Sequence, residues 1–132
     1  MSKHESPLTK RYWESVGGTL VLEFPAVRKR KGHNHGKRLL DGLIIVGSET
    51  KIAKASEVDI EGKDIIVVQT KRGSLQTRLG MYLLGQAFFS KELMKPFKPR
   101  SIRSVAICTA ADDILEPLAA QFGVEVVVYE PD

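Results

Sequence analysis

The sequence contains only one cysteine, Cys108, and no long run of apolar residues. A single thiol excludes an internal disulfide framework and a cysteine-based zinc cluster. Because Cys108 ends the apolar run 105–108, we expect it to belong to the core, as free cysteine usually does. No stretch approaches the roughly 20 apolar residues that cross a membrane, and the first twelve residues lack the apolar segment of a secretion signal. We therefore expect a cytoplasmic protein without a membrane partner.

Common nucleotide-binding motifs are absent as well. The pair Gly17-Gly18 separates a predicted helix from a following strand, which reverses the strand-to-helix order of phosphate-binding glycine loops. Neither internal repeats nor low-complexity segments occur. The 132 residues, 42% of them hydrophobic and 27% charged, have the size and composition of one globular domain with one core. We predict a single domain over residues 1–132.

Positive charge is concentrated in one polar segment. The net charge is +4, and the segment contains Arg28, Lys29, Arg30, Lys31, Lys37 and Arg38. Such a cluster favours a polyanion through phosphate contacts and counterion release, although a solvated loop is the alternative. His33 and His35 lie in the same segment without further metal ligands nearby, so phosphate contact is a better interpretation than a metal site. A second basic group comprises Lys95, Lys98, Arg100 and Arg103.

Apolar periodicity and turn residues predict the secondary structure. We expect helices at 7–16, 75–94 and 112–122, and strands at 19–24, 38–46, 64–71, 102–109 and 124–129. Pro25 is expected to end the first strand and Ser74 to cap the long helix. The stretch 47–60 is either a loop or a short extra strand. Since apolar residues cover much of the circumference of the long helix, we expect it to be largely buried.

This order of elements, αβββαβαβ, predicts an α/β fold with one central mixed sheet. The first three strands suit an antiparallel meander, whereas the strands that alternate with helices suit parallel pairing, with helices on both faces of the sheet.

One carboxylate interrupts an apolar strand. Asp41 lies within the run 39–46, where an unpaired charge on a covered strand would cost several kcal/mol. In the next strand, Gln69 and Lys71 are two residues apart and therefore project from the same face. If the two strands are neighbours, these three side chains meet at one end of the sheet. The alternative for Lys71 is a strand end that has reached water.

Such a group suits metal-assisted hydrolysis of a phosphodiester. Mg²⁺ takes oxygen ligands and is often held by one or two carboxylates together with substrate phosphate. The ion lowers the pKa of a bound water and polarises the phosphorus–oxygen bond. The amine of Lys71 would orient or deprotonate that water and offset charge in the transition state.

Asp41 on the second strand and Gln69-Thr70-Lys71 closing the third resemble the PD-(D/E)xK nuclease superfamily. The resemblance extends over residues 7–129 and implies a restriction-endonuclease-like αβββαβ core with a C-terminal αβ extension. Gln69 stands where the family's pattern has an acidic residue, a Gln-x-Lys form similar to that of Mrr-type relatives. The resemblance implies an endonuclease that uses Mg²⁺ or Mn²⁺, with Asp41 and Gln69 as metal ligands and Lys71 as a catalytic residue.

Other residues would complete such a site. The superfamily usually adds a glutamate from the first helix, and Glu14 is the positional match, although a carboxylate near a helix C-terminus opposes the helix dipole. Glu23 on the first strand is the competing metal ligand. On the long helix, Tyr82 and Gln86 are four residues apart. Gln86 is either a core glutamine with satisfied hydrogen bonds or a group that supports the site or faces DNA, since RecB-type relatives place Gln and Tyr on this helix with a different spacing.

Three functions follow from these observations. The first is a divalent-metal-dependent nuclease that acts on nucleic acid, with DNA the favoured substrate. A chain this short would take its specificity from DNA structure, from a homodimer or from a partner protein. The second is a non-catalytic nucleic-acid-binding or assembly module with the same fold, in which Asp41 and Lys71 form a structural ion pair. The third is a small α/β ligand-binding domain unrelated to nucleases.

Overall fold

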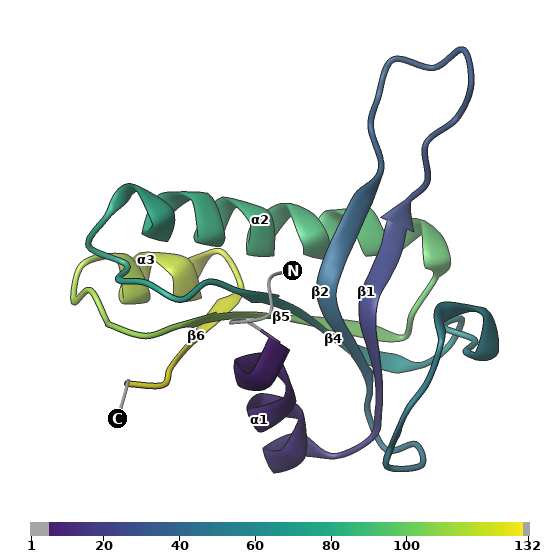
Figure 1. Cartoon of the computed structure of the whole chain (residues 1–132), viewed down its shortest axis with the longest axis horizontal. Coiled ribbons are helices and arrows are strands. Elements are labelled where there is room, and N and C mark those ends of the chain that lie inside the picture. The colour runs from purple at the N-terminus through teal and green to yellow at the C-terminus, as the bar shows by residue number, and fades with distance from the viewer. Residues whose placement is uncertain (1–5, 131–132) are drawn as a thin grey trace.

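A six-stranded mixed sheet with helices on both faces forms the protein (Figure 1). The computed structural model describes residues 6–130. The helices are α1 (Ser6–Val16), α2 (Arg78–Met94) and α3 (Leu115–Gln121), and the strands are β1 (Thr19–Val27), β2 (Arg38–Ile45), β3 (Lys51–Ile52), β4 (Asp64–Thr70), β5 (Ser101–Cys108) and β6 (Val124–Val128). Short 3-10 turns occupy Ala55–Glu57 and Lys95–Phe97. The strands lie in the order β3-β1-β2-β4-β5-β6.

The sheet divides into an antiparallel and a parallel half. Strands β1, β2 and β4 pair antiparallel, and β4, β5 and β6 pair parallel. This confirms the predicted meander and the predicted parallel pairing of the strands that alternate with helices. The parallel half places the C-terminal ends of β4 and β5 at the same edge of the sheet, beside the N-terminal end of β2.

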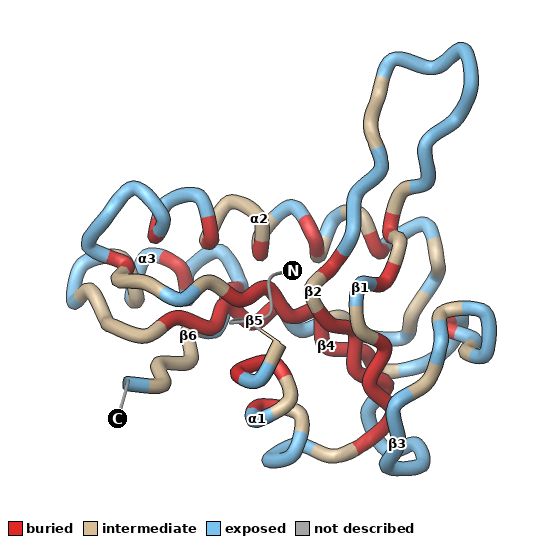
Figure 2. Tube along the Cα trace, viewed as in Figure 1, coloured by how far each residue is buried: buried red, intermediate tan, exposed pale blue. Residues whose placement is uncertain are grey.

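The central strands are covered on both sides, as their continuous apolar runs predicted. On one face, α1 packs Leu8 and Tyr12 against a cluster that includes Ile66. On the other face, Leu83 and Ala87 of α2 form a cluster with α3 and the parallel strands. The most buried backbone therefore follows β2, β4 and β5 (Figure 2).

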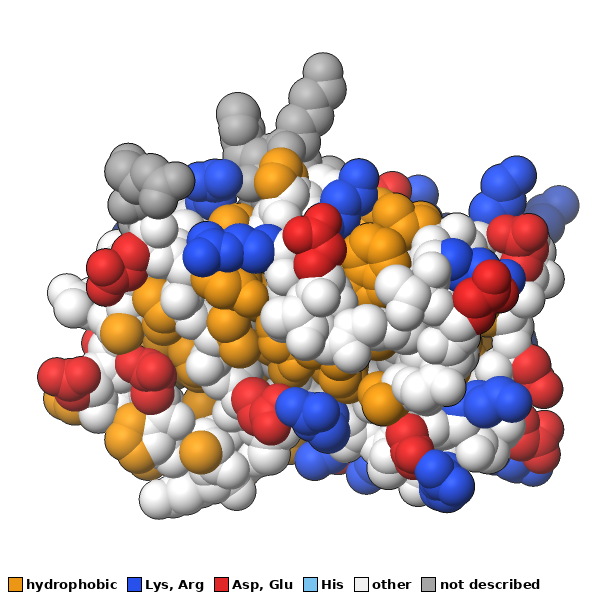
Figure 3. Space-filling model, turned by 90° about the horizontal axis from the view of Figure 1, so that it is seen from below, with side chains coloured by type: hydrophobic (Ala, Val, Ile, Leu, Met, Phe, Trp, Pro, Cys, Tyr) orange, Lys and Arg blue, Asp and Glu red, His pale blue; other side chains and the backbone are white. Residues whose placement is uncertain are grey.

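The face that carries α1 is only partly covered by this helix. Figure 3 shows apolar side chains over the middle of this face, with acidic and basic side chains around them. Trp13, Val127 and Tyr129 pack at the border of the cluster and are only partly buried. The guanidinium carbon of Arg11 lies 4.2 Å from the centroid of the Tyr129 ring, so a cation partly covers that aromatic surface.

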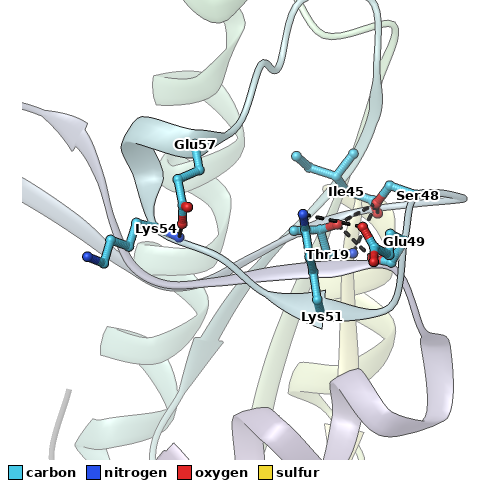
Figure 4. A network of polar contacts seen from close by, with 7 residues as sticks. All are labelled: Thr19, Ile45, Ser48, Glu49, Lys51, Lys54 and Glu57. Atoms are coloured by element: carbon cyan, nitrogen blue, oxygen red, sulfur yellow. Dashed lines mark hydrogen bonds and ion pairs between the residues drawn. The ribbon is translucent and has the colours of Figure 1, made fainter.

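The extra strand that the sequence left open is present. β3 pairs parallel to the start of β1 through Lys51 and Ile52. Polar contacts fix the turn before it (Figure 4): Ser48 Oγ accepts the Thr19 amide at 3.0 Å, and Thr19 Oγ1 donates to the Glu49 carbonyl at 2.7 Å. These contacts lie at the opposite end of β1 from Pro25.

Pro25 does not end the first strand, contrary to expectation. β1 continues to Val27, and Pro25 pairs with Leu39 of β2. Because β3 pairs only with the start of β1, the later part of β1 lies at the edge of the sheet. Proline has no amide hydrogen, and it is tolerated at this edge because no second strand pairs with that side of β1.

The long helix begins later and is more exposed than predicted. Its N-cap is Thr77 rather than Ser74, because Thr77 Oγ1 accepts the Leu79 amide at 3.2 Å. Leu75 instead donates its amide to the Ala110 carbonyl and is buried. Only one side of α2 is buried, and Met81, Tyr82 and Phe89 point into solvent. The apolar residues around its circumference are therefore not all explained by the core.

In the C-terminal part of the chain, the start of the last helix differs from the prediction, whereas the burial of Cys108 agrees with it. The last helix begins at Leu115 rather than at Asp112, because Asp112 Oδ1 accepts the amides of Ile114 and Leu115 and so forms a turn ahead of the helix. Cys108 is buried as predicted, and burial raises the pKa of its thiol. Within residues 6–130, no helix has the length and apolarity needed to cross a membrane.

Candidate functional site

Asp41 and Gln69 come to the same end of the sheet. Gly42 of β2 pairs with Val68 of β4, so the next residues along the two strands, Asp41 and Gln69, lie beside each other. Asp41 Oδ2 accepts a hydrogen bond from the Thr70 amide at 2.7 Å. The predicted proximity of Asp41 to the Gln69-Thr70-Lys71 segment is thus confirmed.

The half-buried carboxylate of Asp41 is positioned by α1 as well as by β4. A Cβ atom on Gly42 would lie 2.9 Å from Thr9 Cγ2, so α1 approaches β2 too closely for a side chain at that position. The hydroxyls of Thr9 and Thr70 are 2.8 Å apart and fully buried. A charge-assisted hydrogen bond from a backbone amide stabilises a carboxylate in such a setting. α1 and β4 therefore meet directly beside Asp41.

Gln69 is buried and tied to α2. Its Nε2 donates to Ser90 Oγ at 2.8 Å, and Ser90 Oγ donates to the Gln86 carbonyl at 2.6 Å. This chain of hydrogen bonds orients the amide and leaves its Oε1 as the atom available to a cation. A sequence pattern could not assign Ser90 to this role, although a polar residue within an apolar helix is the signal that would have raised it.

Lys71 follows β4 directly and is half-buried. Its backbone amide donates to the Ile107 carbonyl at 2.9 Å, which extends the parallel pairing by one residue. Its Nζ lies 5.7 Å from the centroid of the Tyr82 ring on α2. A cation over an aromatic face is attracted by the ring quadrupole, so Tyr82 contributes to the orientation of Lys71. Strand alternation places Lys71 on the same face as Gln69.

Of the two competing glutamates, Glu23 is the one beside Asp41. Leu22 pairs with Gly42 and Phe24 with Leu40, so Glu23 lies opposite Asp41 in the β1–β2 ladder. Glu23, Asp41 and Gln69 thus form one row across three neighbouring strands. Glu23 also has a left-handed backbone with φ of 52°. A non-glycine residue in this conformation is uncommon and tends to occur at functional sites.

Glu14 occupies a different part of the molecule. It is exposed on α1, and it lies about 200° around the helix from the buried Tyr12. Its carboxylate therefore points away from the sheet, while Glu23 lies on the sheet itself. The structure favours Glu23 as the third member of the group.

A groove adjoins this row. It has a volume of about 780 Å³ and lies between the start of β2, the end of β4 and α2; its walls include Arg38, Leu40, Gln69, Tyr82, Gln86 and Phe89. Gln86 Oε1 is buried there without a hydrogen-bond partner. This oxygen therefore lacks the protein hydrogen bond that a satisfied core glutamine would have. An unsatisfied buried oxygen is costly, and such atoms recur at functional sites.

The basic segment forms the tip of the β1–β2 hairpin, which projects well beyond the sheet (Figure 1). Its cationic side chains are exposed. At the base of the hairpin is a cavity of about 590 Å³, and Arg28, Arg30 and His35 contribute to its walls. The rings of His33 and His35 are 5.9 Å apart. In the described part of the chain, no group of three or more His, Cys, Asp or Glu side chains is arranged around a metal position.

The second basic group differs from the hairpin because carboxylates neutralise most of it. Arg100 is paired with Asp64, Arg103 Nη2 lies 2.9 Å from Glu125 Oε2, and Lys95 Nζ lies 2.6 Å from Glu92 Oε2. The pKa of Asp64 is lowered to about 2 by hydrogen bonds from Arg100 and Ser101. The hairpin therefore holds the positive charge that is open to a polyanion.

Comparison with known proteins identifies no relative of this chain: no protein-family model matches it, and no curated protein and no solved structure is significantly similar. The chemistry of the site must be argued from its own residues.

Proposed function

We propose that the protein is a divalent-metal-dependent nuclease with a restriction-endonuclease-like core. The observation that carries the proposal is the row of Glu23, Asp41 and Gln69 across three neighbouring strands, with Lys71 two residues beyond Gln69. Two carboxylates, an amide oxygen and an amine at one sheet end form a donor set that suits metal-assisted phosphodiester hydrolysis.

The arrangement of elements supports the same proposal. An N-terminal helix, an antiparallel meander, a crossing helix and a parallel strand follow one another in the αβββαβ order of restriction-endonuclease-like proteins. In this comparison the short β3 is an addition at the edge, and α3 with β6 is the C-terminal extension. Asp41 and Lys71 then correspond to the family's signature on the second and third core strands.

The donor set fits Mg²⁺ or Mn²⁺. Asp41 and Glu23 would supply carboxylate oxygens, and Gln69 would supply Oε1 because its Nε2 is engaged by Ser90. A bound divalent ion would lower the pKa of a coordinated water and polarise the scissile phosphate. The Thr70 amide holds one oxygen of Asp41, which limits the carboxylate to orientations that keep this bond.

Lys71 is assigned to the attacking water and to charge on the phosphate. Its side chain is half-buried between the end of β4 and Tyr82. An ammonium group held there donates to a phosphate oxygen and stabilises the additional negative charge of the transition state. The ring of Tyr82 keeps the amine near the sheet end.

The hairpin would hold the nucleic acid. Arg28, Lys29, Arg30 and Lys31 are exposed along its tip, and Arg38 lies at its base in the wall of the groove beside Gln69. Phosphate contacts from the hairpin would therefore position a DNA backbone beside Arg38 and toward Asp41. Contacts of this kind confer affinity that does not depend on sequence.

The test is cleavage of plasmid, single-stranded and branched DNA in Mg²⁺ or Mn²⁺. Asp41→Asn retains an oxygen to accept the Thr70 amide but loses the charge, and Lys71→Met retains a long side chain without the amine. We expect each to lower the rate by roughly a hundredfold or more. Asp113→Asn, on the exposed turn before α3, is the control. Cleavage that survives both site substitutions would refute the assignment.

A second function is supported by the hydrogen bonds themselves. Asp41 is bonded to Thr70 and Gln69 to Ser90, so both side chains have structural roles without a metal ion. A non-catalytic nucleic-acid-binding module would use the hairpin and retain these bonds. Salt-dependent DNA binding without cleavage in either metal would favour this function over the nuclease.

A further inference from the structure

The outer side of α2 carries apolar side chains that the chain's own core does not use. Met81, Tyr82 and Phe89 are 65%, 59% and 68% exposed. Phe122 and Leu118 of α3 continue this surface, because they line an apolar groove of about 410 Å³ together with Met81 and Phe89. An apolar patch that joins two helices is unusual on a monomer and marks an interaction site.

A glycine lies at the centre of this surface. Gly85 is four residues from Met81 and four from Phe89, so the three share one stripe of α2. Glycine destabilises a helix interior relative to alanine. No atom lies within 4 Å of the position that a Cβ on Gly85 would take, so nothing in the chain itself requires a glycine there. The close approach of another helix would require it.

The same stripe is self-complementary in charge. Arg78 lies seven residues before Gly85 and Glu92 seven residues after it; both are exposed, and Glu92 also pairs with Lys95 of its own subunit. A two-fold axis through Gly85 pairs each residue of α2 with the residue equally far from Gly85 on the partner helix. Met81 then contacts Phe89 of the partner subunit, and Arg78 meets the partner's Glu92. Complementarity of a surface to itself is what a two-fold dimer requires.

We propose that the protein forms a homodimer through antiparallel packing of α2 against α2 of a second copy, centred on Gly85. The exposed apolar side chains offer on the order of 500 Å² per subunit, taking about 150–250 Å² for each whole aromatic side chain. A standard interface buries about 800 Å² per partner, and roughly 65% of a homodimer interface is apolar. The area therefore matches what a stable dimer needs.

The interface would cover the side of the groove that Met81, Gly85 and Phe89 form, and it would leave Asp41 and Lys71 outside the contact. Asp41 and Lys71 do not line either groove beside the stripe. Tyr82 borders both the stripe and Lys71, so a second subunit would restrict the motion of its ring. Two copies of the site would then lie on one particle, related by the two-fold axis.

Charge reversal tests the pairing. Arg78→Glu and Glu92→Arg each place like charges opposite one another across the axis, whereas the double variant restores two opposite-charge pairs. By sedimentation equilibrium we expect a wild-type dimer, a dissociation constant raised roughly tenfold in each single variant, and near-wild-type affinity in the double variant. Lys10→Glu on α1, on the other face of the sheet, is the control. A wild-type monomer at the highest attainable concentration, or a double variant no tighter than the single ones, would overturn the proposal.

A crosslink tests the position of the axis independently. The two-fold axis brings Met81 to Phe89 of the partner subunit, so the double variant Met81→Cys/Phe89→Cys, which keeps Gly85, should form an intermolecular disulfide under mild oxidation. The native Cys108 is buried and should remain unreacted. Ser15→Cys, exposed on α1, is the matched control and should stay monomeric on a non-reducing gel. Equal crosslinking of the two variants would contradict the antiparallel arrangement.

Discussion

Gln69 is the residue that decides how strongly the candidate site holds a cation. It stands in the row with two carboxylates but contributes only a neutral oxygen, and its other amide atom is committed to Ser90. A carboxylate at this position would add charge to the ligand set. It would also leave the Ser90 hydroxyl without its present donor, because that hydroxyl donates to the Gln86 carbonyl.

These two effects predict that Gln69→Glu binds a divalent metal more tightly but is less stable in its absence. We expect the affinity for Mn²⁺, measured by calorimetry, to rise roughly tenfold, which corresponds to about 1.4 kcal/mol. We expect the free energy of unfolding without metal to fall by about 1–3 kcal/mol, the cost of disrupting a buried polar pair. Gln69→Ala, which loses both the ligand and the donor, separates the effects. Unchanged Mn²⁺ affinity in Gln69→Glu would argue against Gln69 as a ligand.

Gly42 allows α1 to approach the strand that carries Asp41. A Cβ at this position would be 2.9 Å from Thr9 Cγ2, so Gly42→Ala should lower the free energy of unfolding by about 1–3 kcal/mol through overpacking. Adding Thr9→Ser removes the obstructing methyl group while keeping the hydroxyl that faces Thr70. Urea unfolding should show that the double variant recovers most of the stability. A double variant as unstable as Gly42→Ala would exclude this contact as the cause.

Most elements of the fold could be predicted from local pattern, and those that could not depend on neighbours in space. β2 and β4 are predictable because each contains an apolar run, 43–45 and 65–68, that is buried on both faces. The continuation of β1 past Pro25 depends on its position at the edge of the sheet. The start of α2 depends on the contact of Leu75 with Ala110, which lies on a different part of the chain. Neither feature leaves a periodic signal.

The candidate site likewise contains residues that the sequence pattern predicts and residues that only their neighbours in space identify. Asp41, Gln69 and Lys71 are recognisable because polar residues interrupt apolar strands at the spacing of one sheet face. The preference for Glu23 over Glu14 requires the strand register, which sequence periodicity does not supply. The contact between Thr9 and Thr70 requires the approach of α1. The sequence therefore indicates which strands form the site, and the strand register identifies Glu23 as its second carboxylate.

The starts of β4 and β5 are joined by a charged contact whose strength depends on pH. Arg100 and Ser101 donate to Asp64, and they lower its pKa from 3.8 to about 2. A depressed pKa in the folded state means that the contact stabilises the protein above about pH 4 and that this contribution disappears as the pH falls toward 2. Urea unfolding between these pH values should therefore show a steeper decline of stability in the wild type than in Asp64→Asn. Asp113→Asn on an exposed turn is the control, and equal slopes in wild type and Asp64→Asn would refute the link.

The hairpin should act on DNA through charge alone. Replacing Arg28, Lys29, Arg30 and Lys31 by glutamine should weaken binding to every duplex. It should also reduce the slope of log affinity against log salt by about 0.9 for each phosphate that the variant no longer neutralises. Fluorescence anisotropy over a salt series measures this slope. Lys95→Gln, whose amine is paired with Glu92, should leave the slope unchanged. A hairpin variant with the wild-type slope would exclude the hairpin from DNA binding.

The whole molecule is held together by β4 and β5, which contribute to the clusters on both faces of the sheet. The two faces also carry separate spectroscopic reporters. Trp13, the only tryptophan, lies on the α1 side and donates its indole hydrogen to the Gly18 carbonyl at 2.7 Å. The helical circular dichroism arises mostly from α2 and α3 on the opposite side, since these helices have 17 and 7 residues and α1 has 11.

Because both faces depend on the same strands, we expect them to unfold together. Trp13 fluorescence and circular dichroism at the α-helical band should give coincident urea transitions with one midpoint, as a single cooperative domain does. If α2 also joins two subunits, both midpoints should move to higher urea as protein concentration increases, since association stabilises only the folded chain. A circular-dichroism transition that precedes the Trp13 transition would instead show that α2 detaches before the sheet unfolds. In that case the positions of Gln69 and Lys71 would depend on α2 docking, through Ser90 and Tyr82, rather than on the sheet alone.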